Sequence, residues 1–146
     1  MLTTSHYCPL CKPDNEVVLW QDAYLRVIRV PDEEYPGYLR VIWTAHLAEM
    51  SDLDSHGRQH IMSIVMAAEE ALRDCIRPDK INLASFGNMV PHLHWHVIGR
   101  FRTDRHFPQP VWGSPQRQSR LPAGAVRDDE ALADALRRAI SRIGAA

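Results

Sequence analysis

The chain has 146 residues, of which 45% are hydrophobic and 24% charged, enough for one globular domain with a substantial core. Its formal net charge of -1 provides no broad positive field, so neither nucleic acid nor an acidic membrane surface is expected as a partner. No apolar run approaches the roughly 20 residues of a membrane-spanning helix, and "MLTTSHYCPLCKPDNE" lacks the order of a secretory signal, so we expect a cytoplasmic protein.

Three short stretches in the first half of the chain have the pattern of β-strands. Residues 17–20, 24–30 and 38–43 are rich in β-branched, aromatic and other apolar residues. The connecting sequence "PDEEYPG" contains two prolines, a glycine and three acids, which is typical of a turn. Because the connections are short, we expect these stretches to form an antiparallel meander.

The spacing of apolar residues changes after this meander. Apolar residues recur at steps of three and four from Ile61 to Leu72, which predicts a helix over about residues 55 to 76. Asp54 or Ser55 is the expected N-cap, and a proline lies just past the expected end.

The second half of the chain returns to strands and ends in a helix. "KINLASF" and "HLHWHVIG" are strand candidates, and "GNMVP" between them is a turn. Residues 107–126 are rich in proline and arginine, which indicates a long surface segment, and residues 127–143 have the charge order of a helix. The pattern predicts an α+β fold in a single domain over residues 1–146: an antiparallel sheet of about five strands, a central helix and a C-terminal helix.

The stretch "HLHWHVI" alternates histidines with apolar residues. On a strand, alternate side chains face one side, so His92, His94 and His96 share a face while Leu93 and Trp95 face the other. On a helix the three rings would splay by roughly 200° per step and would not converge. The pattern therefore predicts three imidazoles on one face of a strand.

Three interpretations of these histidines remain open. They can form a solvated strand face, two of them can bind a metal such as zinc, or one can be a nucleophile. A neutral imidazole, whose ordinary pKa is about 6.5, can attack phosphorus and form a covalent phosphoramidate. Asn82, Ser85, Gly87 and Asn88 just upstream offer amide donors and close backbone approach, which favours phosphorus chemistry.

The histidine run and its flanks resemble the histidine-triad (HIT) family of nucleotide hydrolases and transferases. "HLHWHVI" fits every position of the family pattern His-φ-His-φ-His-φ-φ, in which φ is apolar. "RVIWTAHLAEMSDL" resembles the family's strand, short turn, histidine and helix entry, and "INLASFGNMVPHLHWHVIGRF" resembles its asparagine strand, glycine turn and triad strand. The resemblance covers about residues 7–106 and implies a HIT-like fold, nucleotide binding and a homodimer.

The resemblance also implies roles for individual residues. His94 would attack the α-phosphate of a nucleotide, His96 would bind phosphate oxygens and the leaving group, and His92 would orient the nucleophile. Asn82 and Asn88 align with family amides that contact the phosphates or the scissile bridge. The backbone amide of Met89 falls where the family often has a serine, so a hydroxyl contact is missing here.

The nucleoside site implied by the resemblance lies on the early strands. Leu25, Ile28 and Val30 would lie near the base and the ribose, although the usual polar ribose partner is absent at Val30 and Asp32 would have to substitute. Tyr38 stands where many family members have a histidine that supports the triad.

The sequence "CPLC" places Cys8 and Cys11 at the spacing of a metal knuckle, although a redox pair has the same spacing. Resemblance to zinc-bearing relatives implies that His46 and His92 complete a structural zinc site with these cysteines. Cys75, within the expected helix, is interpreted as a small core residue.

Four further residues lie at or beyond the end of the triad strand. Contact with substrate is one interpretation of His106 and Trp112 in the long surface segment. Arg100 and Arg102 could supply positive charge to a phosphate, although solvated arginines are the simpler interpretation.

Taken together, these features predict an enzyme that cleaves a phosphorus bond in a dinucleoside polyphosphate or a nucleoside phosphoramidate, with no metal needed for the chemistry. A nucleotide-binding module with little catalysis and a structural zinc protein are the alternatives.

Overall fold

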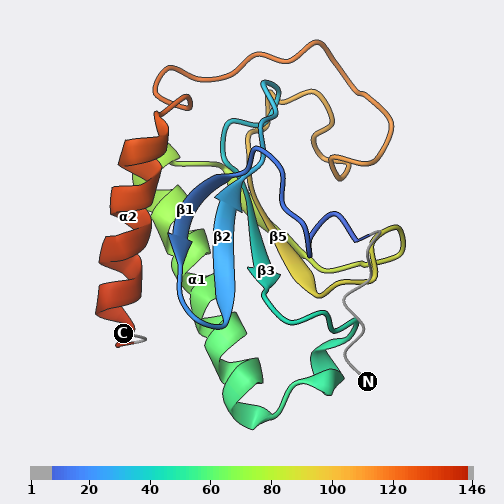
Figure 1. The fold of residues 1–146 in the computed structure, drawn as a ribbon. Helices are drawn as coiled ribbons and strands as arrows, with labels where there is room; N and C mark the ends of the chain where they lie inside the picture. The colour runs from blue at the N-terminus through green and yellow to red at the C-terminus, as the bar shows by residue number, and fades with distance from the viewer. Residues whose placement is uncertain (1–7, 145–146) are drawn as a thin grey trace.

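The computed structural model describes residues 8–144, which form one antiparallel sheet with two helices packed against it (Figure 1). The sheet order is β1-β2-β3-β5-β4, and every neighbouring pair is antiparallel. The strands are β1 (Val17–Gln21), β2 (Leu25–Arg29), β3 (Tyr38–Trp43), β4 (Lys80–Ala84) and β5 (His94–Arg100). The helices are α1 (Ser55–Ile76) and α2 (Asp129–Arg142), with a 3-10 helix η1 (Met50–Asp52) before α1. This architecture confirms the expected α+β fold.

Both long helices begin at an aspartate that caps them. The side chain of Asp54 accepts a hydrogen bond from the backbone N–H of Gly57, and Asp128 does the same for Ala131. The first of these confirms Asp54 as the N-cap of the central helix. Because Asp128 is the cap, the C-terminal helix begins two residues later than the charge pattern predicted.

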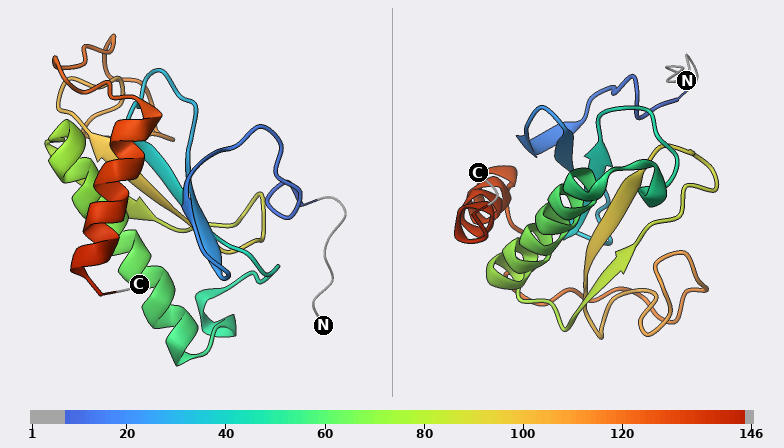
Figure 2. Two further views of the ribbon diagram at one scale, coloured as in Figure 1. Left: turned by 60° about the vertical axis from the view of Figure 1, so that its left-hand side comes forward. Right: turned by 90° about the horizontal axis from the view of Figure 1, so that it is seen from below.

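The core lies between the sheet and the helices, which cover one side of the sheet (Figure 2). Alternate strand residues point to this side, as strand geometry requires. The strand contributions include Leu25, Val27, Leu39, Val41 and Val97, and those of α1 include Ile61, Ile64, Val65 and Leu72. The residues that alternate with these core residues on β3 and β5 therefore face the side of the sheet that the helices do not cover.

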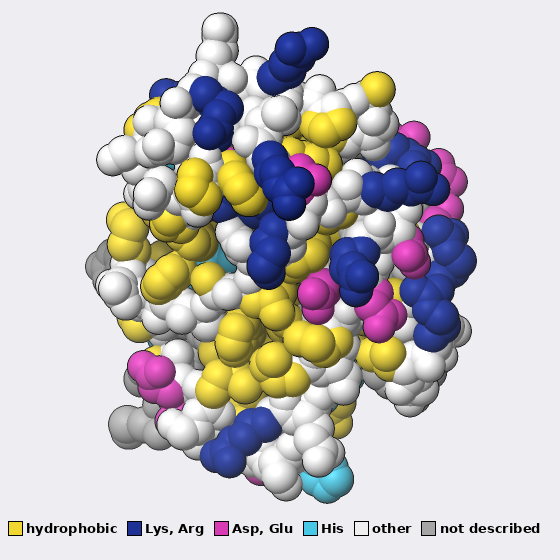
Figure 3. All heavy atoms as spheres, turned by 180° about the vertical axis from the view of Figure 1, so that it is seen from behind, with side chains coloured by type: hydrophobic (Ala, Val, Ile, Leu, Met, Phe, Trp, Pro, Cys, Tyr) yellow, Lys and Arg dark blue, Asp and Glu magenta, His cyan; other side chains and the backbone are white. Residues whose placement is uncertain are grey.

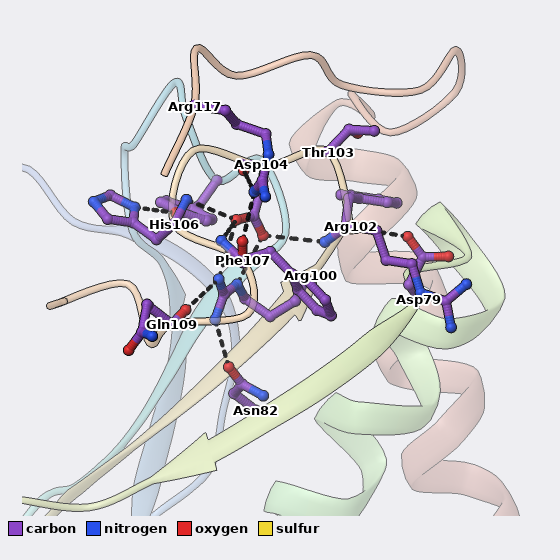
Figure 4. Close-up of polar contacts among 12 residues, drawn as sticks. Asp79, Asn82, Arg100, Arg102, Thr103, Asp104, His106, Phe107, Gln109 and Arg117 are labelled. Atoms are coloured by element: carbon purple, nitrogen blue, oxygen red, sulfur yellow. Dashed lines mark hydrogen bonds and ion pairs between the residues drawn. The ribbon is translucent and has the colours of Figure 1, made fainter. Parts of the chain in front are cut away.

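Arg100 at the end of β5 anchors the long segment that follows it (Figure 4). Its guanidinium makes a two-pronged ion pair with Asp104, at 2.8 and 3.0 Å, and also donates to the side-chain oxygen of Asn82 and the carbonyl of Gln109. Arg100 is only 1% exposed, so the simpler expectation of a solvated arginine was wrong. A buried charge needs such partners, and here they fix the path of the segment.

The outer surface carries apolar side chains as well as charges. Figure 3 shows a band of hydrophobic side chains across the face opposite that of Figure 1, with charged side chains gathered along one flank. Within residues 8–144, neither long helix has the combination of length and hydrophobicity required to cross a bilayer.

Candidate active site and metal cluster

A pocket of about 540 Å³ opens on the side of the sheet that the helices do not cover. Its floor comes from alternate residues of two adjacent strands, His94 and His96 on β5 with Tyr38 and Arg40 on β3. The β4–β5 loop, the N-terminal arm and the long segment after β5 complete its walls. The predicted alternation of the histidines therefore places two of the three rings in one cavity.

His94 is held by its own strand neighbour. Its Nδ1 lies 2.6 Å from the backbone carbonyl oxygen of His92. A carbonyl can only accept a hydrogen bond, so Nδ1 carries the proton and Nε2 keeps the lone pair. Burial lowers the pKa of His94, which favours the neutral ring near pH 7. A neutral imidazole with a free Nε2 lone pair is a nucleophile.

His96 is held by Tyr38 across the strand pair. The Tyr38 hydroxyl oxygen lies 2.9 Å from Nδ1 of His96. Burial lowers the pKa of His96 to about 4, and the nearby Arg40 and His94 act in the same direction, so this ring is also neutral. Burial raises the pKa of Tyr38, which keeps its hydroxyl proton available for donation. If that proton goes to Nδ1, the imidazole proton lies on Nε2.

Two half-exposed aromatic rings stand beside these histidines. The ring of Trp112, from the long segment, lies 5.1 Å from that of His96 and 4.9 Å from that of Phe86 in the β4–β5 loop. Trp112 is 51% exposed and Phe86 58% exposed, and both line the pocket. Trp112 was a candidate contact in the sequence, whereas Phe86 was missed because a single aromatic residue in a loop has no periodicity.

The β4–β5 loop brings two further sequence candidates to the pocket. Asn88 and Met89 both line it, after Gly87, whose φ of +80° suits the turn. The Met89 side chain is 96% exposed and offers no hydroxyl, so only its backbone can supply a polar contact.

Several other candidates do not line the pocket. Asn82 lies opposite Ile98, one row beyond His96, and its amide oxygen accepts from Arg100 instead. Leu25 is fully buried in the core on the helix side, because strand alternation turns it away from the histidines. Ile28 packs in a small apolar cluster, and Val30 lines a different hollow. The lining of the histidine pocket includes neither of them, nor does it include Asp32, Arg100, Arg102 or His106.

The arm and the triad strand meet in a second cluster made of Cys8, Cys11, His46 and His92, whose ligand atoms lie within 4.8 Å of one another. The Cys8 and Cys11 sulfurs lie 3.4 Å from Nδ1 of His92, and Cys11 lies 3.1 Å from Nδ1 of His46. The two Nδ1 atoms are 3.2 Å apart. Tetrahedral zinc, with Zn–S of about 2.3 Å and Zn–N of about 2.0–2.1 Å, requires separations of about 3.3 Å between two nitrogens, about 3.5 Å between a sulfur and a nitrogen, and about 3.8 Å between two sulfurs. The donor set and its spacing fit zinc.

His92 has the tautomer that a metal ligand needs. Its Nε2 lies 2.6 Å from the backbone carbonyl oxygen of Trp43, so Nε2 carries the proton and the Nδ1 lone pair faces the cluster. The side chain is fully buried, and burial lowers its pKa, which favours the neutral form that binds metals. His92 thus belongs to the cluster rather than to the lining of the pocket.

The comparisons with known proteins agree on one family. The model of the HIT domain family matches residues 12–103. A curated relative, the AP-4-A phosphorylase of Mycobacterium tuberculosis (strain CDC 1551 / Oshkosh), is 27% identical over 85 residues, which cover 54% of this chain and 44% of that protein. The chain therefore spans less than half the length of this relative.

Solved structures agree in fold. A histidine triad protein from Bradyrhizobium japonicum has a TM-score of 0.67 and 29% identity, with 86% of this chain and 90% of that chain covered. One from Marinobacter aquaeolei VT8 has a TM-score of 0.69 and 22% identity, with 97% and 98% covered. A Zn-bound histidine triad family protein from Mycobacterium smegmatis has a TM-score of 0.58 and 16% identity, with 92% and 91% covered.

Proposed function

Because the chain belongs to the HIT family, we propose that it is a nucleotide-binding hydrolase or nucleotidyltransferase that cleaves a phosphorus bond at the α-phosphate of a nucleotide conjugate. The observation that carries this proposal is the hydrogen bond from Nδ1 of His94 to the His92 carbonyl, which leaves a neutral ring with a free Nε2 lone pair in a pocket. Dinucleoside polyphosphates and nucleoside phosphoramidates are the candidate substrates.

The proposed reaction has two displacements. Nε2 of His94 attacks the α-phosphorus, a P–N bond forms, and the bond from phosphorus to the leaving group breaks. Water then attacks the same phosphorus, the P–N bond breaks, and His94 returns to the neutral ring that carries its proton on Nδ1. The proton lost by water passes to the released phosphate or to bulk water. Each step replaces one bond to phosphorus by another, so the nucleotidyl group ends on water.

The state of His96 bears on the leaving group. A ring with a pKa of about 4 is neutral near pH 7, so it can donate a hydrogen bond from Nε2 but is a poor proton donor. A polyphosphate departs as an anion that needs no proton, whereas an amine must gain one. A neutral His96 suits a polyphosphate leaving group, and the name of the Mycobacterium tuberculosis relative, AP-4-A phosphorylase, suggests the same substrate class.

We also propose that zinc binds Cys8, Cys11, His46 and His92, because the donor set and spacing fit it. Bound there, zinc supplies a structural crosslink and takes no part in the reaction. The cluster ties the N-terminal arm to the start of β5, and Pro9 and Leu10 of that arm line the pocket. We propose further that the chain acts as a single domain in a homodimer, for which the apolar band in Figure 3 offers a contact surface.

The test is replacement of His94 by Asn, with a panel of dinucleoside polyphosphates and phosphoramidates. We expect turnover to fall by at least about a thousandfold, and intact-mass measurement of rapidly quenched wild type to show one added nucleotidyl group. His56→Asn, on the exposed start of α1, is the matched control. Unchanged turnover in the His94 variant would remove this residue from the nucleophile role.

The alternative of a binding module with little catalysis is favoured by one observation, the outward Met89 side chain that offers no hydroxyl to a leaving group. Nucleotide binding by wild type without turnover of any conjugate in the panel would support that alternative.

A further inference from the structure

Arg40 is the charged residue of the pocket floor. Among the described residues that line the pocket, it alone carries a formal charge, and none of them is acidic. It lies on β3 directly opposite His96 on β5, and strand alternation puts its side chain on the same face as Tyr38. A single cation therefore stands beside the two catalytic candidates.

The guanidinium of Arg40 has an unsatisfied donor. Its Nε is buried and has no hydrogen-bond partner, although the rest of the guanidinium contacts Tyr38, which it hydrogen-bonds and whose ring centre lies 6.0 Å from its central carbon. Within residues 8–144, no carboxylate forms an ion pair with it. Arg100, by contrast, has a partner for each nitrogen of its guanidinium.

A buried donor without a partner costs free energy, and the cost is larger for a charged group than for a neutral one. A protein can retain such an unpartnered donor where a bound ligand satisfies it. The planar fork of arginine matches the oxygens of a phosphate, and its charge complements an anion in a pocket whose histidines are neutral. A carboxylate of the protein would compete with such an anion, and the lining contains none.

We propose that Arg40 is a further catalytic residue that binds the nonbridging oxygens of the phosphate attacked by His94. The inference rests on the proposed function for the identity of the ligand. Arg40 then holds the phosphorus over Nε2 of His94 and stabilises the charge on the oxygens during both displacements. No sequence signal pointed to it, because an arginine two residues from Tyr38 on a strand is also the pattern of a solvated face.

The experiment measures the affinity of AMP and of adenosine for wild type, Arg40→Gln and Arg40→Lys by calorimetry. These two ligands differ by the phosphate alone, so the ratio of their affinities reports the phosphate contact and needs no turnover. We expect wild type to prefer AMP, Arg40→Gln to lose about 10-fold to 100-fold of that preference, and Arg40→Lys to keep part of it. Adenosine affinity should change less than about threefold.

Arg138→Gln removes the same charge from the exposed face of α2 and should leave both affinities unchanged. Thermal unfolding without ligand checks that each variant is folded, and Arg40→Lys tests the charge with the aliphatic stem retained. An unchanged AMP preference in folded Arg40→Gln would overturn the inference. Absence of turnover in wild type, together with an AMP preference that depends on Arg40, would remove the hydrolase proposal and retain the phosphate site.

Discussion

The hydroxyl oxygen of Tyr38 on β3 lies 2.9 Å from Nδ1 of His96 on β5, in the interior of the pocket floor. The two residues are not directly opposite one another, since Tyr38 pairs with Ile98 and Arg40 pairs with His96. The contact is therefore diagonal, which a long aromatic side chain can reach. A phenol at this place can fix the tautomer of His96 without adding a charge to the site.

Replacement of Tyr38 by Phe tests this contact. The variant keeps the ring but leaves a buried imidazole nitrogen without its partner, which should cost about 1–3 kcal/mol of stability. Because the His96 tautomer is no longer fixed, we expect kcat/KM on dinucleoside polyphosphates to fall about 10-fold to 100-fold, mainly through kcat. Steady-state kinetics and urea denaturation measure the two effects. Equal activity in the variant would show that the hydroxyl does not orient His96.

Disruption of the buried ion pair of Arg100 should be strongly destabilising. Asp104→Asn leaves a buried guanidinium without its charged partner, and we expect a loss of about 3–5 kcal/mol in the free energy of unfolding. The exposed pair of Arg137 and Asp134 on α2 is the control, and Asp134→Asn should cost less than about 1 kcal/mol. Urea denaturation compares them. Similar losses in both variants would contradict the anchoring role of Arg100.

Stability should fall in acid partly because of His96. Its pKa is about 4 in the folded protein, against 6.5 for an ordinary histidine, so below pH 6.5 the unfolded chain binds a proton that the folded ring does not. The contribution of the buried neutral ring to the free energy of unfolding is fully present above pH 6.5. It is lost as the pH falls towards 4, with a slope of up to about 1.4 kcal/mol per pH unit. Denaturation of wild type and His96→Gln at several pH values measures the slope. Parallel curves would contradict the assignment.

Protonation of Asp104 should lower the stability of the fold at a lower pH than protonation involving His96. Burial alone would raise the pKa of Asp104, but hydrogen bonds from Arg100 and from the backbone of Phe107 outweigh it and lower the pKa below 3.8. The carboxylate therefore stabilises the fold above the ordinary pKa, and this stabilisation disappears as the pH falls through the lowered value. Asp104→Asn should remove the steepest part of the stability curve below pH 3.8. A wild-type curve that is flat there would be inconsistent with this.

Metal analysis tests the zinc cluster. Protein purified without chelator should contain about one zinc per chain, and Cys11→Ser should contain far less. Removal of the metal should lower the melting temperature, because metal binding stabilises only the folded state. Cys75→Ser on α1 is the matched control, since Cys75 is not part of the cluster. Wild-type protein with essentially no zinc and no chelator effect would contradict the proposal.

The sequence predicted those features that depend on local periodicity. Alternation placed His94 and His96 on one face, and the steps of three and four identified α1. The place of Asn82 could not be found this way, because periodicity gives the face of a strand but not the distance along it. Leu25 was assigned to the nucleoside site by resemblance alone, and the structure has it in the core on the helix side.

The sequence also could not predict the role of residues that depends on whether a partner distant in the chain is present. Arg40 and Arg100 look alike in the chain, yet one has an unpartnered Nε and the other is enclosed by hydrogen bonds. The partners of Arg100 come from β4 and from the long segment, and no spacing rule links them. The convergence of Cys8 and Cys11 with His46 and His92 was implied by family resemblance rather than by local geometry.

The strand that carries the catalytic candidates is fastened on both sides of them. His92, just before β5, is tied to the Cys/His cluster, and Arg100, the last residue of β5, is tied to Asp104. His94 and His96 lie in the span between, which leaves little freedom for the relative displacement of their rings. Substitutions in the Cys/His cluster or in the Arg100–Asp104 ion pair should therefore change the rate of the chemical step, although these residues do not contact the nucleotide. The loops around the pocket can vary while the spacing of the two rings stays constant.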